Sequence, residues 1–177
     1  VPLEVERIYV GKWAGERIMS QEAIGEVLVE QAQKGRRVVR LKGGDVFLFG
    51  RGGEECSCLE AQGIPFEIVP GVSSANDDPA NAAIPNTQRR FTTTLNVVTG
   101  HDGNGEQGSR VDWQKVATAS DTLVILMGTR RVKTIMTQLI AHGCPKEHPA
   151  AMISWGPLGQ QESLFGTLVT LPLLAQK

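Results

Sequence analysis

The sequence predicts an α/β fold, and three observations lead to this prediction. Short runs rich in β-branched residues alternate with stretches of helical periodicity, which is typical of βαβ units and a parallel sheet. Glycine clusters follow several of the strand-like runs, at the ends where the ligand loops of such a sheet gather. A hydrophobic content of 41% over 177 residues is enough to bury a core, in one domain or in two small ones.

The first half of the chain predicts alternating strands and helices. We expect a strand over 1–10 and then a helix that Ser20 caps and that ends before Gly35, a typical residue after a helix C-terminus. Ser73 or Ser74 is expected to cap a later helix. The elements expected after Gly35 are a strand over 37–41, a helix over 54–62, a strand over 65–70 and a helix over about 73–83.

A polar, basic connector at 87–90 divides the chain, so we place one domain at 1–90 and the other at 91–177. Asp112 and Thr129 are expected to cap helices in the second domain. The glycine-rich stretch 100–110 predicts a mobile loop. The elements expected here are a strand over 92–99, a short helix after Asp112, a strand over 122–127, a helix over 129–142 and two last strands, over 150–155 and 166–171, that could form a hairpin.

Composition excludes several classes of function. A net charge of −1 argues against a general nucleic-acid surface, and no stretch approaches the roughly 20 apolar residues of a membrane span. We expect no secretory signal, because no charged-then-apolar stretch precedes Val1. The three cysteines lack the spacing of a metal site, and the histidines form no ligand set, so we expect free thiols and no bound metal. The prediction is a soluble, cytoplasmic protein.

The most informative stretch is 40–55, Arg-Leu-Lys-Gly-Gly-Asp-Val-Phe-Leu-Phe-Gly-Arg-Gly-Gly-Glu-Glu, which follows an expected strand. Gly43 and Gly44 allow a close approach of the backbone to a ligand, because neither has a Cβ. Asp45 can then accept hydrogen bonds from a ribose or an amino group. Taken alone, Gly-Gly-Asp after a strand is more often just a turn.

The whole stretch closely resembles the signature of the tetrapyrrole methyltransferases, in particular the uroporphyrinogen-III C-methyltransferases. The resemblance extends from Gly11-Lys-Trp-Ala-Gly15 to Gly166-Thr-Leu168. It implies S-adenosyl-L-methionine (SAM) as methyl donor, S-adenosyl-L-homocysteine as product, and a tetrapyrrole acceptor, in a cleft between two small α/β domains. The implied reaction is the C-methylation of uroporphyrinogen III to precorrin-2, for sirohaem or cobalamin biosynthesis, by a homodimer.

The resemblance also assigns cofactor-binding residues, all in loops that follow strands. They are Gly43, Gly44, Asp45, Leu48, Ser73, Ser74, Met127 and Gly156. Each loop alone has a simpler interpretation as a turn or a cap. The dinucleotide fingerprint G-x-G-x-x-G is absent, which disfavours a nicotinamide site. Lys12 matches a lysine with a proton-donor role in the family; the alternative is a solvated lysine in a loop, and the role requires a lowered pKa.

The implied acceptor carries many carboxylates, which predicts a cationic pocket. Arg51 and Arg89 are the first candidates, because the planar guanidinium suits carboxylates. The remaining cations near the expected strand ends could simply be solvated surface. They are Arg40, Lys42, Arg90, Arg130 and Arg131.

The sequence departs from the family pattern in three places. The family begins with a strand and a glycine-proline loop upstream of the segment matching Val1, and a closing strand follows the segment matching Leu171, so we expect a fragment without full activity. Val46 replaces a proline, which predicts a looser loop. Polar and acidic residues at 76–78 and 81 replace small apolar and aromatic ones, at a cost if they are buried without partners.

Two alternatives remain open. One is another methyltransferase of the same fold, acting on a precorrin, on diphthine or on ribosomal RNA. The other is a non-catalytic fragment that serves as a binding or interaction module. Binding of the macrocycle without SAM would favour the second.

Overall fold

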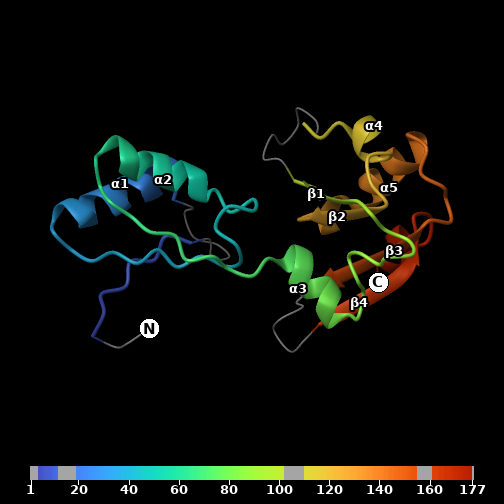
Figure 1. The fold of residues 1–177 in the computed structure, drawn as a ribbon, viewed down its shortest axis with the longest axis horizontal. Helices are drawn as coiled ribbons and strands as arrows, with labels where there is room; N and C mark the ends of the chain where they lie inside the picture. The colour runs from blue at the N-terminus through green and yellow to red at the C-terminus, as the bar shows by residue number, and fades with distance from the viewer. Residues whose placement is uncertain (1–3, 12–18, 102–109, 155–160, 177) are drawn as a thin grey trace. The chain divides into compact units, whose positions relative to one another are not determined.

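The computed structural model describes residues 4–11, 19–101, 110–154 and 161–176 (Figure 1). The chain forms two compact units, Val1–Gly71 and Val72–Lys177. Segment 72–90 belongs to the second unit, in which helix α3 (Ser74–Asn81) packs on strands described below. The domain division at 1–90 and 91–177 stays a prediction.

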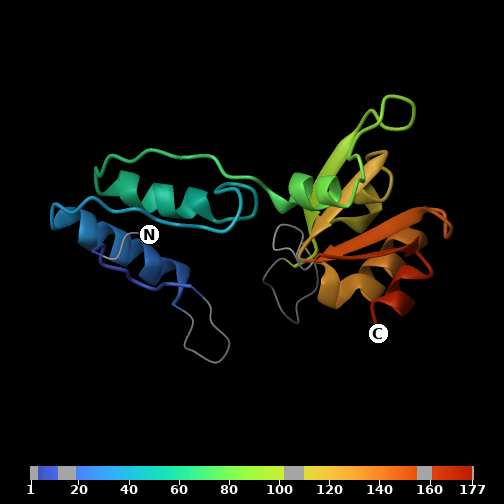
Figure 2. The same cartoon turned by 90° about the horizontal axis from the view of Figure 1, so that it is seen from below.

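The described part of the first unit is built on two packed helices, α1 (Gln21–Gln33) and α2 (Gly52–Ala61) (Figures 1 and 2). Ser20 caps α1 as predicted, since its hydroxyl accepts a hydrogen bond from the amide of Ala23 at 3.1 Å. Gly25 lets the helices approach, because a Cβ there would lie 2.9 Å from the sulfur of Cys58. Ile24 and Leu28 are the buried apolar residues of α1.

The prediction of strands in the first unit is wrong for 37–41, for 65–70 and for the described residues 4–10. These segments run without strand pairing in the described part of the unit, although the β-branched pattern is present (Figure 2). A strand is stabilised by main-chain hydrogen bonds to a neighbouring strand, and no described segment supplies one here. Apolar side chains therefore stay in solvent, as at Val69, which is 76% exposed.

The described part of the second unit contains two two-stranded sheets. β1 (Leu95–Thr99) pairs with β2 (Thr122–Leu126) in parallel, which confirms the predicted parallel pairing for this half. β3 (Pro149–Ser154) pairs antiparallel with β4 (Glu162–Thr167), so the predicted hairpin of the last strands is confirmed. Its second strand lies earlier than the predicted 166–171, because Leu171–Leu174 form helix α6, in which Pro172 fits the first turn.

Two more α-helices belong to the described part of this unit. Asp112 caps α4 (Trp113–Val116) as predicted, by accepting a hydrogen bond from the amide of Lys115 at 3.2 Å. The prediction that Thr129 caps the next helix is wrong: the 3-10 turn η2 (Thr129–Arg131) precedes α5 (Val132–Ala141), and no side chain caps either. The core of the unit consists of buried side chains from these elements and from β4 to α6. They are Trp113, Ile135, Met136, Leu139, Leu168 and Leu171.

In helix α3, a side chain from outside the helix replaces a hydrogen bond that a proline cannot donate. The hydroxyl of Ser73 caps the helix, which confirms one of the two predicted caps. Pro79 has no N–H, so it cannot donate the helical hydrogen bond to the carbonyl of Ala75, four residues earlier. The side-chain amide of Asn86 donates to that carbonyl instead, at 2.8 Å.

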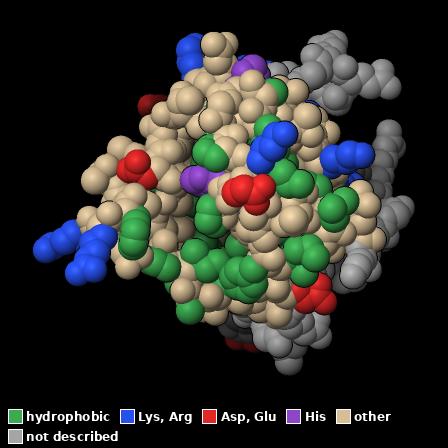
Figure 3. Space-filling view, turned by 90° about the vertical axis from the view of Figure 1, so that its right-hand side faces the viewer, with side chains coloured by type: hydrophobic (Ala, Val, Ile, Leu, Met, Phe, Trp, Pro, Cys, Tyr) green, Lys and Arg blue, Asp and Glu red, His purple; other side chains and the backbone are tan. Residues whose placement is uncertain are grey.

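The surface on the side shown in Figure 3 carries interspersed charges of both signs, with hydrophobic side chains gathered in its lower part. This agrees with the net charge of −1. Among the described residues, no helix is long and apolar enough to cross a membrane. No group of three or more His, Cys, Asp and Glu residues in the described ranges is placed to hold a metal ion.

Candidate functional site

In the first unit, the candidate site is the turn from Gly43 to Leu48. Gly44 has φ +87°, a conformation that favours glycine. One oxygen of Asp45 accepts hydrogen bonds from the amides of Leu48 at 2.8 Å and Phe47 at 2.9 Å. These two hydrogen bonds, chiefly the one from Leu48, lower the pKa of Asp45, so the carboxylate is ionised at neutral pH. The turn therefore presents a negative charge held by its own backbone.

The loop that follows this turn closes tightly on itself. The carbonyl of Val46 accepts a hydrogen bond from the amide of Gly52 at 3.1 Å, and a Cβ at Gly50 would lie 2.6 Å from the same oxygen. The acceptor is a main-chain carbonyl that a proline would also have, so the looser loop expected from Val46 stays a prediction. Phe49 and Arg51 adopt left-handed φ values of +55° and +58°. Such strain in residues other than glycine often marks functional sites.

The predicted substrate-binding arginines have different surroundings. Arg51 makes a two-point ion pair with Glu54, at 2.8 Å from Nε and 2.6 Å from Nη2. This hydrogen bonding raises the pKa of Arg51. Arg89 is exposed and makes no ion pair with any residue that the structure describes. Arg40 and Lys42, which precede the turn in the chain, form ion pairs with the buried carboxylate of Glu55.

In the second unit, the carboxyl ends of the parallel strands β1 and β2 come together at two glycines. A Cβ on Gly100 would lie 2.5 Å from the Cα of Gly128, and the amide of Gly100 donates to the carbonyl of Leu126 at 2.7 Å. Met127 has φ +59° and remains 54% exposed. Ligands of α/β sheets bind at this end of the strands, so the exposed thioether lies where a ligand is expected.

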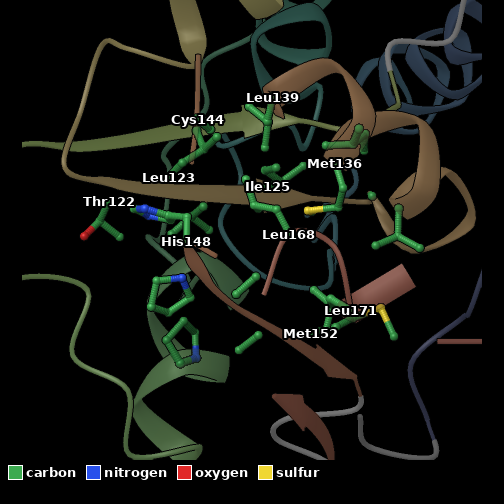
Figure 4. Close-up of a pocket in the computed structure, with 18 of the residues that line it drawn as sticks. Thr122, Leu123, Ile125, Met136, Leu139, Cys144, His148, Met152, Leu168 and Leu171 are labelled. Atoms are coloured by element: carbon green, nitrogen blue, oxygen red, sulfur yellow. The ribbon is translucent and has the colours of Figure 1, made fainter. Parts of the chain in front are cut away.

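A cavity of about 530 Å³ lies within the second unit (Figure 4). Both Ser74 and Met127 line it, so the structure brings two predicted cofactor-binding residues to one cavity. Leu139 of α5 and Met152 of β3 are among its apolar lining residues, and Thr122 and His148 lie together at one side of it. Its volume is typical of small-ligand pockets, and its lining is both polar and apolar.

Asp78 also lines this cavity, and sequence reasoning did not assign it to the site. One of its carboxylate oxygens is buried and has no hydrogen-bond partner among the described residues. Burial, and then the charge of Asp77, raise the pKa of Asp78. The signal was present in the unexplained acidity of 76–78, whose third member is Asp78. The side-chain oxygen of Asn76, unlike that oxygen of Asp78, has a partner: it accepts a hydrogen bond from the side-chain amide of Asn86 at 3.1 Å.

Two further predicted residues, Lys12 and Gly156, lie outside the described residues, and so does most of the predicted loop 100–110. The other predicted cofactor-binding residues belong to two groups. Gly43, Gly44, Asp45 and Leu48 lie in the turn of the first unit. In the second unit Ser74 and Met127 line the cavity, and Ser73 is the N-cap residue of α3.

Comparison with known proteins decides the family. Residues 4–172 match the family described as tetrapyrrole (corrin/porphyrin) methylases. The chain belongs to this family. The family and the α/β fold class predicted from the sequence are therefore confirmed. The siroheme synthases of Escherichia coli (strain K12 / DH10B) and Shigella boydii serotype 18 are each 44% identical to this methylase over 174 residues, or 98% of its length. The chain spans 37% of the length of those relatives.

Solved structures agree with this assignment. A uroporphyrin-III C-methyl transferase from Thermus thermophilus, complexed with S-adenyl homocysteine, is 30% identical, with a TM-score of 0.75 over 92% of this methylase and 72% of that chain. The native form of the Thermus thermophilus enzyme is 31% identical, with a TM-score of 0.77 over 96% of this chain and 71% of that one. A cobalt precorrin-4 methyltransferase, 23% identical with a TM-score of 0.78 over 92% of this chain and 66% of that one, shares the fold.

Proposed function

We propose that this methylase chain transfers a methyl group from SAM to a pyrrole carbon of uroporphyrinogen III, on the way to precorrin-2 for sirohaem or cobalamin. Its family, its 44% identity to siroheme synthases and its likeness to a uroporphyrin-III C-methyl transferase complexed with S-adenyl homocysteine support this function. We further propose that the protein acts in the cytoplasm as a homodimer.

One observation supports the proposal for this chain: the Gly43–Leu48 turn combines an open backbone position with an ionised carboxylate, which the polar part of SAM needs. A Cβ at Gly43 would meet no heavy atom within 4 Å, so the backbone there is open to a ligand. Asp45 is ionised and suits an ammonium group or ribose hydroxyls. When bound, SAM supplies an electrophilic methyl group on a sulfonium. The residues proposed to hold it are Gly43, Gly44, Asp45, Leu48, Ser73, Ser74, Met127 and Gly156.

The chain's own contribution is alignment and charge. Correct alignment of donor and acceptor can lower a barrier by roughly 7–11 kcal/mol, so rigid turns are the main requirement. Arg51 and Arg89 are proposed to bind acceptor carboxylates; for Arg51 this requires exchange of its pairing with Glu54. Lys12 is proposed as the proton donor.

The test is calorimetric titration of the folded chain with S-adenosyl-L-homocysteine, followed by a methylation assay with SAM and uroporphyrinogen III. The expected result is saturable binding that Asp45→Asn weakens at least about tenfold, because the change removes the charge at nearly constant size. The control Glu60→Gln makes the same kind of change on the exposed side of α2 and should bind like the wild type. A folded chain that binds no S-adenosyl-L-homocysteine would refute the catalytic proposal.

The methylation assay separates the remaining candidates. Methyl transfer to a precorrin, to diphthine or to ribosomal RNA, with none to uroporphyrinogen III, would replace the proposed acceptor. Binding of the macrocycle without binding of S-adenosyl-L-homocysteine would favour a non-catalytic binding module instead.

A further inference from the structure

We propose that Glu55 is a positioning residue for cofactor binding: it fixes Lys42, and through Lys42 the adjoining Gly43–Leu48 turn, in the geometry that receives the methyl donor. This inference rests on the proposed function, and it assigns a role to a residue outside the set proposed to hold the cofactor.

Glu55 is the buried centre of a polar network in the first unit. It is 5% exposed and lies on α2. Lys42 donates to both carboxylate oxygens, at 3.1 and 3.0 Å. Gln21 of α1 donates at 3.1 Å and Arg40 at 3.3 Å. One carboxylate thus joins both helices to the segment that leads into the turn.

This network matters because main-chain hydrogen bonds do not hold the segment. Residues 37–45 make no backbone–backbone hydrogen bond to any described residue, since the predicted strand over 37–41 has no partner. Lys42 directly precedes Gly43 in the chain, and its side chain is only 11% exposed. A buried, two-point ion pair at this position restricts the start of the turn more closely than solvated side chains can.

The charge state supports the same role. Burial raises the pKa of Glu55, but hydrogen bonds from Lys42 and Gln21, with the charges of Arg40 and Lys42, lower it by more. Glu55 is therefore ionised at neutral pH. Removal of that charge leaves the largely buried cations Arg40 and Lys42 without compensation, and they would turn toward solvent.

The decisive variant is Glu55→Gln, with Glu60→Gln on the same helix as the matched control. S-adenosyl-L-homocysteine is titrated into each folded chain at a temperature well below its melting midpoint. We expect Glu55→Gln to raise the Kd at least about tenfold and Glu60→Gln to change it less than about twofold. In turnover assays the KM for SAM should rise while kcat at saturating SAM stays close to that of the wild type.

A second measurement separates positioning from general destabilisation. Amide hydrogen exchange of 43–48 should become faster in Glu55→Gln, while exchange of α2 stays slow. If Glu55→Gln does not fold, Lys42→Met tests the same link from its other end and should raise the Kd by a similar factor. In the double variant the two losses should not add.

The outcomes are distinguishable. Equal affinity of the wild type and Glu55→Gln for S-adenosyl-L-homocysteine would overturn this inference and leave the proposed function standing. An affinity loss accompanied by fast exchange throughout α2 would also overturn it, because the role would then be structural. A wild-type chain that binds no S-adenosyl-L-homocysteine would refute the proposed function, and this inference with it.

Discussion

Gly71→Ala tests whether the Gly44–Asp45 turn depends on close backbone packing. A Cβ at Gly71 would lie closest to the carbonyl oxygen of Gly44, 2.9 Å from its carbonyl carbon and 3.3 Å from the amide nitrogen of Asp45. Ordinary van der Waals contact begins near 3.4 Å, so the two backbone segments must separate by more than about 0.5 Å. Overpacking of this kind costs roughly 1–3 kcal/mol of folding free energy.

The same displacement should reduce cofactor affinity. Productive sites tolerate misplacements of about 0.5 Å, and a 1 Å error can cost about 100-fold, so we expect an increase in Kd of about tenfold or more. Calorimetric titration with S-adenosyl-L-homocysteine measures the affinity, and urea unfolding measures the stability. The control is Gly53→Ala: a Cβ there meets nothing within 4 Å, and alanine should stabilise α2 by up to roughly 0.5–1 kcal/mol without changing the affinity. Wild-type affinity in Gly71→Ala would refute the reasoning.

Three further predictions concern the second unit. Hydrogen bonds from two threonines lower the pKa of Asp121 from its usual value to about 2, so the stabilisation they give is complete above about pH 4 and is lost as the pH falls toward 2. In Asp121→Asn the free energy of unfolding should therefore fall less steeply with pH, as measured by urea unfolding at pH 7, 4 and 3. A pH profile like that of the wild type would contradict this role of Asp121. Ile135→Ala, at a side chain that is 2% exposed, should cost roughly 2–5 kcal/mol, and a cost below about 1 kcal/mol would show a core that collapses around the cavity. Asn86→Ala should cost roughly 0.5–1.5 kcal/mol of folding free energy in the same unfolding assay. The cost should be smaller in a Pro79→Ala background, because the restored N–H can donate to the carbonyl of Ala75. Equal costs in both backgrounds would argue that Asn86 does not replace the missing helical hydrogen bond.

Helix boundaries in this chain were predictable because their causes are local. Ser20, Ser73 and Asp112 each place a side-chain oxygen within reach of an amide two or three residues later, and all three cap the helices expected from the sequence. Gly35 also ends α1 as predicted, with φ +73°. Thr129 failed as a cap because a 3-10 turn intervenes, and no residue type in the sequence marks that turn.

Strands were predictable only where their partners are present. The residues of β1 and of 37–41 show the same β-branched pattern, yet only β1 has a neighbour in register, Leu95 opposite Thr122. Periodicity reports what a segment is able to do, whereas pairing depends on residues far away in the sequence. The candidate site divides in the same way. The glycines and Asp45 were visible as a motif, but the cavity, the unpartnered oxygen of Asp78 and the network of Glu55 required coordinates.

Backbone strain adds information about the site that glycine motifs cannot give. Four residues other than glycine adopt left-handed φ in the described ranges, at a cost of roughly 1–2 kcal/mol each: Phe49, Arg51, Ala83 and Met127. Ala83 follows the C-terminus of α3, where a left-handed residue commonly ends a helix. The other three coincide with or adjoin residues that the sequence assigned to cofactor or substrate. A fold retains such strain where the surrounding contacts hold the residue in that conformation. Beside Arg51, the hydrogen bond from the amide of Gly52 to the carbonyl of Val46 is such a contact. The strained positions therefore support, independently of the sequence motif, the two places where we propose that ligands bind.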